Sequence, residues 1–246
     1  MYRLCCDISR FASRSLAEGI CVANMLHIND IAISDIGRKT LETCSGAEVE
    51  DIRCALIDSN KTIVLLHTQL PLADTAAYNT LFRKAHLLNV KNVRIHLAEQ
   101  APNADALSEI LRMANAWNIG IVFQNNPQTF FRDDPSMTAF MKGLGGHVAV
   151  SFDPAGFVAL AKHPFFHVFY GSKLKNRVRF LQLQDTLYSN DEPMPLGGGN
   201  SEIKELISIL LSRSYDGWFC ITPYLDNTPD GMAASVQQYH QLLKTM

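Results

Sequence analysis

Short apolar runs rich in β-branched residues alternate along the chain with longer runs whose apolar positions recur every three or four residues. The first pattern is typical of buried strands and the second of amphipathic helices. Strands are predicted at residues 2–7, 31–36, 62–67, 92–97, 120–124, 147–153, 178–184 and 217–222. Helices are predicted at residues 13–26, 47–58, 74–88, 105–118, 137–143, 157–170, 201–213 and 232–244.

Strict alternation of strands and helices with short connections predicts a parallel sheet, and eight such units favour closure into a (β/α)8 TIM barrel. The length of 246 residues suits one such barrel, for which about 250 residues is typical. An open doubly wound sheet is the rival fold, but the turn CDISRFAS after the first strand has no glycine to approach a phosphate. No segment resembles a linker, so we expect residues 1–246 to form a single α/β domain.

Alternate residues of a barrel strand point inward, and the inward polar residues gather at the C-terminal strand ends, where such barrels carry their active sites. Every predicted strand ends near a polar residue of the inward set. Hydroxyl, amide and imidazole groups in such a mouth suit a small polyol better than an apolar ligand. The eight residues are Asp7, Ser34, His67, His96, Gln124, Asp153, Gln182 and Thr222, and Gln184 and Asp185 adjoin them as further candidate ligand contacts.

Several of these residues also have a purely structural interpretation. His67 and His96 can be hydrogen-bonded interior residues, and Asp153 can cap the turn formed by DPAG. Arg94 lies one layer deeper than His96, so we expect it to be an electrostatic partner of Asp7 rather than a substrate clamp. Ser201 is expected to cap the helix that follows the GGG turn.

The overall composition is that of a water-soluble protein, with 47% apolar and 19% charged residues and a net charge of −2. The chain has no long basic run, which argues against nucleic acid as a partner. No apolar run approaches the roughly 18 residues of a membrane span, and the N-terminus lacks a signal-peptide core. Six cysteines without metal-ligand spacing indicate reduced thiols, so we expect a cytoplasmic location.

Several strand ends resemble those of the sugar isomerase/epimerase family, the xylose-isomerase-like barrels. NAWNIGIVFQNNP is similar to that family's strand ending in Glu-Asn-His-Pro, and VAVSFDPAGF to its strand ending in Asp-Pro-Gly-His. FLQLQDT resembles its His-x-Lys-Asp strand. PLGGGNSEIKELISILLSRSYDGWFCITPY resembles its Pro-Leu-Gly-x-Gly loop, helix and terminal strand, which normally ends in Glu.

The resemblance implies a metal site, but this chain departs from it. The family binds one divalent metal through Glu, Asp, His and Glu, and the two Glu residues exchange protons with the sugar. Only the Asp is retained, because the four positions hold Gln124, Asp153, Gln182 and Thr222. Amides and a hydroxyl are poor ligands for hard cations and poor general bases, so no cofactor is expected beyond a weakly held divalent ion.

Three functional hypotheses follow. The first is a carbohydrate-binding barrel of isomerase ancestry whose metal and acid–base positions are lost. The second is an active, metal-independent isomerase or epimerase that uses His67 and His96 with Asp153. The third, nucleic-acid repair by analogy with the family's endonuclease IV branch, is disfavoured because the multi-metal cluster of that branch is missing.

Two surface segments have alternative interpretations, and the sequence leaves the oligomeric state open. The loop 129–137, with Phe130 beside Phe131, is expected to be exposed and to serve either as a lid or as a dimer contact. Lys173, Lys175 and Arg177 can bind a phosphate handle or form a solvated surface run.

Overall fold

The computed structural model describes residues 3–144, 148–170, 174–188 and 192–246. Eight strands form a closed parallel barrel in the order β1-β10-β7-β6-β5-β4-β3-β2, which confirms the predicted (β/α)8 TIM-barrel fold. Two further strands, β8 (Asp185–Thr186) and β9 (Pro193–Met194), pair antiparallel. The barrel strands are β1 (Arg3–Asp7), β2 (Asp30–Ile33), β3 (Thr62–Thr68), β4 (Asn92–Ile95), β5 (Gly120–Gln124), β6 (Val148–Phe152), β7 (Val178–Leu183) and β10 (Trp218–Ile221).

Helices follow the barrel strands, as the alternation of patterns predicted. They are α1 (Ser9–Ala12), α2 (Leu16–Met25), α3 (Gly46–Asp58), α4 (Thr75–Leu87), α5 (Ala104–Ala116), α6 (Asp134–Lys142), α7 (Pro154–Val158), α8 (Ile203–Leu211) and α9 (Pro229–Lys244). Shorter turns occur at η1 (Leu41–Thr43), a π-helical segment η2 (Pro164–Tyr170) and η3 (Leu174–Asn176). Polar caps set many helix starts, for example the Asp74 carboxylate that accepts from the N–H of Ala77 before α4.

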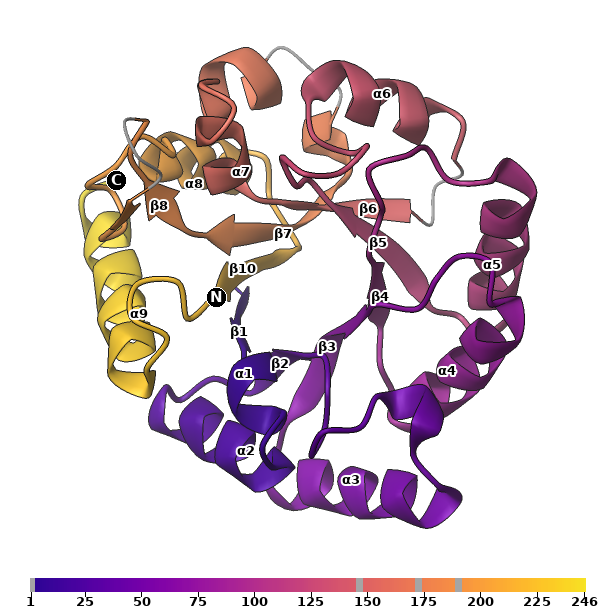
Figure 1. The fold of residues 1–246 in the computed structure, drawn as a ribbon. Coiled ribbons are helices and arrows are strands. Elements are labelled where there is room, and N and C mark those ends of the chain that lie inside the picture. The colour runs from indigo at the N-terminus through magenta and orange to yellow at the C-terminus, as the bar shows by residue number, and fades with distance from the viewer. Residues whose placement is uncertain (1–2, 145–147, 171–173, 189–191) are drawn as a thin grey trace. The chain divides into compact units, whose positions relative to one another are not determined.

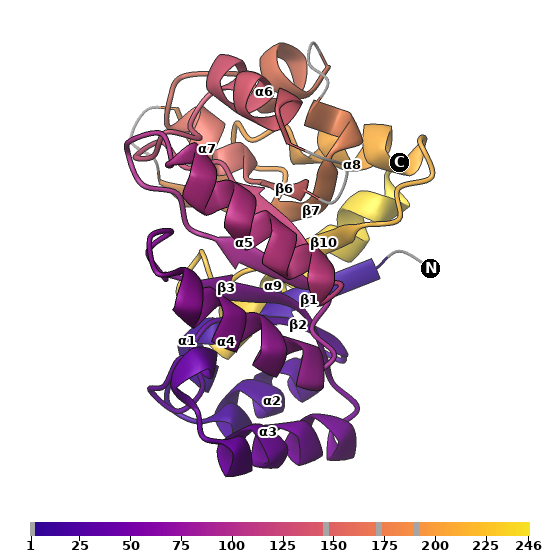
Figure 2. The same ribbon diagram turned by 90° about the vertical axis from the view of Figure 1, so that its right-hand side faces the viewer.

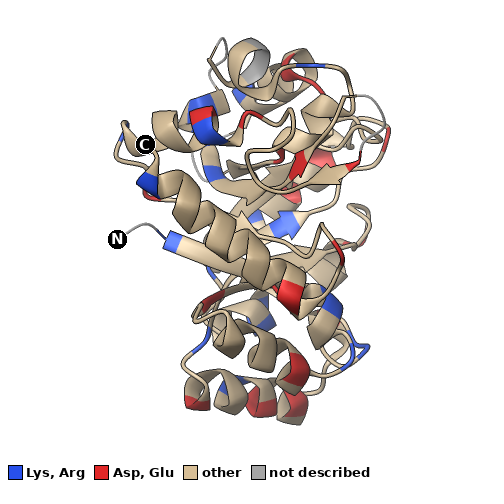
Figure 3. Ribbon diagram, turned by 90° about the vertical axis from the view of Figure 1, so that its left-hand side faces the viewer, with Lys and Arg blue, Asp and Glu red and all other residues tan. Residues whose placement is uncertain are grey.

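The chain groups into two compact units, Cys5–Phe123 and Gln124–Met246 with Met1–Leu4, and each is described by itself. In the unit Cys5–Phe123, helices α2, α3 and α4 lie outside the strands (Figure 1), and α4 and α5 lie side by side (Figure 2). Acidic positions gather along α3, where Glu50, Asp51 and Asp58 are exposed (Figure 3). The expectation of a single domain stays a prediction.

In the unit that contains Gln124–Met246, aromatic side chains form much of the buried core. Phe180 of β7 stacks on Trp218 of β10 with ring centroids 5.1 Å apart, and Phe152 of β6 stacks on Phe157 of α7 at the same separation. Such contacts add stabilisation beyond that of the buried apolar area. They join β7 to β10 and the C-terminal end of β6 to α7.

Two predicted helices differ in the structure. The helix predicted at 13–26 corresponds to α2 alone and starts later than expected, because the Ser15 side chain accepts the N–H of Glu18 and caps α2; the short helix α1 before it was not predicted. The helical segment predicted at 157–170 becomes α7 and η2, which are separated by a turn in which Ala161 adopts φ +55°.

Candidate functional site

A chain of neutral polar groups crosses the ends of β5, β6 and β7. The Gln182 amide donates to the Ser151 hydroxyl (2.7 Å), which donates to the Gln124 carbonyl oxygen (3.1 Å). The Gln124 amide nitrogen lies 3.5 Å from Oδ2 of Asp153, at the outer limit of a hydrogen bond. The structure therefore brings together Gln124, Asp153 and Gln182, three residues that the sequence assigned to one site.

Asp153 is held by its backbone as well as by its side chain. Its Oδ1 accepts the N–H of Ala155 (3.1 Å), so Asp153 caps α7, as the structural interpretation of DPAG predicted. The Asn125 side chain forms a reciprocal pair with the Asp153 backbone, donating to its carbonyl and accepting from its N–H, both at 2.7 Å. The partnership of Asp153 with His67 or His96 stays a prediction.

Thr222 and Gln184 lie further along the same strands. Parallel pairing sets Cys220 opposite Gln182, so Thr222 lies level with Gln184 two residues later. Gln184 is half-buried, whereas Thr222 is buried and its hydroxyl has no partner among the described residues. A buried unpaired hydroxyl is costly unless a water or ligand meets it.

Asp185 organises the loop that precedes α8. Its carboxylate is buried and accepts four backbone N–H groups, from Thr186 (2.9 Å), Gly197 (2.8 Å), Gly199 (3.0 Å) and Ser201 (2.9 Å). A Cβ atom at Gly199 would lie 2.4 Å from Oδ1 of Asp185, which explains the glycine at this position. A direct contact between Asp185 and a ligand stays a prediction.

The expected Ser201 cap of α8 is wrong. The N-cap is Glu202, in the left-handed region at φ +50°, and its carboxylate accepts the N–H of Phe165 (2.7 Å) instead of capping its own helix. Ser201 is buried and its N–H already serves Asp185, so the chain turns into the helix one residue later.

The residues at the family's metal positions do not fit a divalent ion. Asp153 supplies the one carboxylate, and its two oxygens face the Ala155 N–H and the Gln124 amide. Hard cations require several anionic oxygens, often with an imidazole. Among the described residues, no group of three or more His, Cys, Asp or Glu side chains is placed to hold a metal. Metal content itself stays a prediction.

A second polar cluster lies in the unit Cys5–Phe123 and centres on a carboxylate–imidazole pair. Nε2 of His67 lies 3.1 Å from Oδ2 of Asp7. The other oxygen of Asp7 accepts from both the N–H (2.9 Å) and the hydroxyl (2.5 Å) of Ser9, the residue that begins α1. This arrangement fixes the carboxylate, which in turn orients the imidazole.

Electrostatics favour an anionic Asp7 and a neutral His67. Burial alone would raise the pKa of Asp7, but the interactions with His67, Ser9 and Arg94 outweigh burial and hold that pKa well below its usual range. Burial and the Arg94 guanidinium lower the pKa of His67, although Asp7 opposes them. A neutral His67 donates through Nε2 to Asp7, which leaves Nδ1 as an acceptor. Nδ1 is buried and has no partner among the described residues.

Arg94 and His67 are register partners on β4 and β3, which fits the expected electrostatic role of Arg94 beside Asp7. Ser34 is half-buried just after the end of β2. His96 is exposed just after the end of β4, and its backbone N–H donates to the carbonyl of Thr68 (3.3 Å). The assignment of His96 as an acid–base group stays a prediction.

Three residues of these clusters, Ser9, Ser151 and Asn125, were missed by the sequence analysis. Ser151 lay on the inward face of its strand, one layer below Asp153, which was the available signal. Ser9 follows its strand end by two residues, and nothing in the local sequence distinguishes it from an ordinary turn residue. The available signal for Asn125 was its match to the Asn of the Glu-Asn-His-Pro motif.

The loop 129–137 is not the exposed loop that was expected. Phe131 is fully buried and Phe130 is half-buried, and both pack edge-on against Phe140 of α6, with centroids 5.7 Å and 5.5 Å away. Residues 134–137 already belong to α6. The two aromatic rings therefore pack against α6 and bury apolar area within the chain.

Of the basic residues that follow η2, Lys175 and Arg177 form hydrogen bonds within the protein. Arg177 donates to the carbonyls of Val148 and Leu144, both at 3.4 Å, and Lys175 donates to the carbonyl of Tyr170 (3.0 Å). Lys173 lies outside the described residues. In the described part of the chain, no helix is both long and apolar enough to cross a bilayer.

Comparison with solved structures identifies the fold. The chain is similar to a D-tagatose 3-epimerase-like protein (TM-score 0.78, 17% identity, 99% of this chain and 97% of that one). It is also similar to a xylose isomerase-like TIM-barrel protein from Mycobacterium smegmatis in complex with magnesium (0.76, 17%, 100% and 97%). A sugar phosphate isomerase/epimerase from Parabacteroides distasonis also matches (0.70, 13%, 98% and 95%). No protein-family model and no curated protein matches the chain.

These similarities confirm, for the fold, the resemblance to the xylose-isomerase-like barrels that the strand ends predicted. The structural neighbours include sugar isomerase/epimerase-like TIM barrels. Identities this low establish the architecture, and the chemistry of the site has to be argued from the residues themselves.

Replacing Asp185 by Ala should destabilise the protein by about 3 kcal/mol, because buried N–H groups lose a charged acceptor. Urea unfolding measures the free energy, and amide exchange at Gly197 and Gly199 should accelerate. The control is Asp216→Ala, which removes an exposed carboxylate paired with Arg179 and should cost less than about 1 kcal/mol. Equal losses in the two variants would contradict the anchoring role of Asp185.

The pKa of His67 should lie below the ordinary value of about 6.5 in an NMR titration of the ring. Arg94→Leu should raise this pKa, since a nearby cation is removed, and Asp7→Asn should lower it further.

The stability of the fold should depend on pH through the same group. As the pH falls, His67 of the unfolded chain binds a proton at a higher pH than His67 of the folded protein does. The stability supplied by neutral His67 is therefore present above about pH 6.5 and is lost as the pH falls through the folded pKa.

The control for this titration is Arg112→Leu, which removes a guanidinium paired with Glu109 on the outer face of α5 and should leave the pKa of His67 unchanged. A wild-type pKa at or above the ordinary value would contradict the electrostatic assignment.

Proposed function

We propose that this protein binds a small carbohydrate-like ligand without a metal, at the ends of β5, β6 and β7. The observation that supports the proposal is the hydrogen-bond chain from Gln182 through Ser151 and Gln124 to Asp153. It occupies positions that hold metal ligands and proton-transfer groups in the family that the sequence resembles.

The donors and acceptors of this chain suit a polyol. An amide carries both a donor and an acceptor, as a sugar hydroxyl does, so amides and hydroxyls can exchange partners without leaving a charge unpaired. The half-buried Gln124 and Asp153, with the unpartnered Thr222 hydroxyl, are the groups that a ligand would meet in this unit. The family's isomerase chemistry uses two Glu residues as bases, and this chain has Gln124 and Thr222 at those positions. An amide cannot accept a proton at neutral pH, and a hydroxyl is too weakly basic without an activating partner.

We also propose a reducing, cytoplasmic location and no nucleic-acid partner. Two exposed thiols, Cys21 and Cys54, support the first, because exposed thiols are oxidised or paired in oxidising compartments. The slightly acidic net charge of −2 supports the second.

Calorimetric titration of a panel of free aldoses and ketoses tests the proposal. Binding should persist in excess EDTA, and Gln182→Leu should weaken it about tenfold or more, since a buried hydrogen-bonding group is lost. Gln237→Leu, the same change at an exposed position of α9, serves as the control and should bind like wild type. A tightly bound stoichiometric metal held by Gln124, Asp153 and Gln182 in the purified protein would refute the proposal.

A second candidate is a metal-independent isomerase or epimerase that uses His67. The observation that favours it is the Asp7–His67 pair, in which Ser9 fixes the carboxylate and the carboxylate fixes the imidazole. A neutral imidazole with a free Nδ1 lone pair can accept a proton from a substrate hydroxyl or carbon acid. In this candidate Asp7 orients His67, a role that the sequence analysis had given to Asp153.

If the second candidate holds, the protein should interconvert a free ketose with an epimer or aldose without added metal. His67→Phe should then lower kcat at least a hundredfold, as loss of a general base does, and Asp7→Asn should lower it less while shifting the pH profile. His96→Phe separates the contribution of the second imidazole. Turnover that survives both His67→Phe and His96→Phe would exclude the histidine mechanism.

A further inference from the structure

A cavity of about 130 Å³ lies at the C-terminal ends of β2 and β3 in the unit Cys5–Phe123. Its polar lining consists of Ser34, Asp35, Thr40, Glu42, His67, Thr68 and Gln69, and three leucines form the apolar part. It has room for several water molecules but is smaller than the 300–1,000 Å³ of a typical drug-sized pocket. The occupant is therefore a small molecule, or one end of a larger one.

The hydrogen-bonding character of the cavity is set by His67. Its side chain is only 5% exposed and its Nε2 is committed to Asp7, so Nδ1 remains as a buried acceptor without a described partner. An unpaired buried acceptor costs free energy unless a ligand or water donates to it. A ligand that carries a hydrogen-bond donor, such as a hydroxyl group, would therefore pair with this acceptor.

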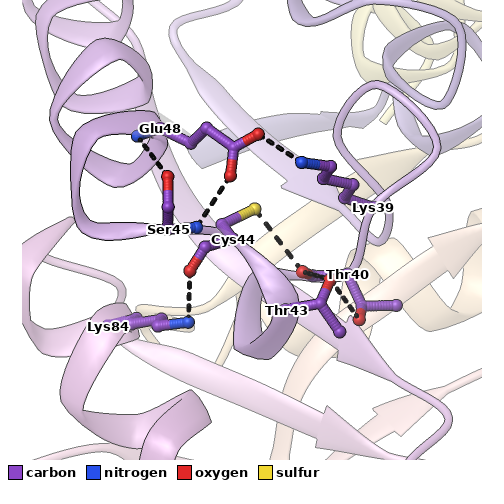
Figure 4. Close-up of polar contacts among 7 residues, drawn as sticks. All are labelled: Lys39, Thr40, Thr43, Cys44, Ser45, Glu48 and Lys84. Atoms are coloured by element: carbon purple, nitrogen blue, oxygen red, sulfur yellow. Dashed lines mark hydrogen bonds and ion pairs between the residues drawn. The ribbon is translucent and has the colours of Figure 1, made fainter.

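The charge of the lining disfavours anions. Asp35 and Glu42 contribute carboxylates, and the described residues that line the cavity include no Lys or Arg. Two nearby lysines, Lys39 of the adjoining loop and Lys84 of α4, are already engaged (Figure 4). Lys39 pairs with Glu48, and Lys84 donates to the carbonyls of Glu42 (2.6 Å) and Cys44 (2.5 Å). A phosphate group entering this cavity would meet the carboxylates of Asp35 and Glu42, with no Lys or Arg among the lining residues to compensate.

The cavity wall formed by η1 is stabilised by hydrogen bonds within the protein itself. The Thr43 hydroxyl and the Cys44 thiol both donate to the carbonyl of Thr40, at 2.8 Å and 3.5 Å. Ser45 and Glu48 form a capping box at the start of α3 (Figure 4). A preformed wall lowers the ordering cost of binding.

We infer that this cavity binds an uncharged polyol, or the unphosphorylated end of a sugar, with one hydroxyl donating to Nδ1 of His67. The inference rests on the proposed carbohydrate-type function and adds to it a polyol contact in the unit Cys5–Phe123, which favours an unphosphorylated group at this cavity. Asp7 acts as a positioning residue in this assignment, since it holds Nε2 and leaves Nδ1 as the remaining acceptor of the ring.

The test uses erythritol, glycerol and glycerol 3-phosphate as probes with the full-length protein. Amide chemical-shift titration should show saturable binding of erythritol at Ser34, Thr40 and Thr68, and at least tenfold weaker binding of glycerol 3-phosphate than of glycerol. His67→Phe should weaken erythritol binding about tenfold or more, and His240→Phe, the same change at an exposed position of α9, should not.

Ser34→Phe provides a second variant, because it fills the cavity from a half-buried position and leaves His67 intact. Loss of erythritol binding in Ser34→Phe, with a native circular dichroism spectrum, supports the inference even if His67→Phe fails to fold. Erythritol binding that Ser34→Phe leaves intact and Gln182→Leu abolishes would overturn the inference while sparing the proposed function. Tighter binding of glycerol 3-phosphate than of glycerol would overturn the choice of uncharged ligands, and absence of all polyol and sugar binding would overturn both proposals.

Discussion

The constraint on which both polar clusters depend is that a buried polar group at a strand end must find a partner. Asp185 meets it fully, because four backbone N–H groups surround one carboxylate and fix the loop before α8. That loop exists in this form only because Gly199 leaves room for the carboxylate. The constraint is not met at Nδ1 of His67 and the hydroxyl of Thr222, which have no partner among the described residues.

The two clusters satisfy the constraint by different chemistry. Gln182, Ser151 and Gln124 pass hydrogen bonds along neutral groups, which recognise hydroxyls but transfer no protons at neutral pH. Asp7 and His67 form an oriented pair of an anionic carboxylate and a neutral imidazole, whose pKa is lowered by burial and by Arg94. The first cluster thus presents neutral donors and acceptors, and the second presents an imidazole that a carboxylate holds in place.

The sequence was sufficient for the architecture because period and alternation are repeated along the whole chain. It also grouped Gln124, Asp153 and Gln182 correctly, since strand-end position is a property of the pattern. It failed where a single backbone dihedral decides the outcome. Glu202 at φ +50° moved the start of α8 past Ser201, and the Ser15 cap moved the start of α2 past residue 13. Ser9 was missed because only three-dimensional proximity to Asp7 gives it a role.

The amide at Gln124, a position that holds a Glu in the family that the sequence resembles, is compatible with the carboxylate of Asp153 beside it. Gln124 accepts from Ser151 through its oxygen and directs its nitrogen toward Asp153, so one amide joins a hydroxyl and a carboxylate. A second carboxylate in its place would repel Asp153 unless a cation lay between them. An amide at position 124 keeps the shape of a glutamate side chain and avoids that repulsion. Asp153 also caps α7 and pairs with Asn125, which gives it a structural role of its own.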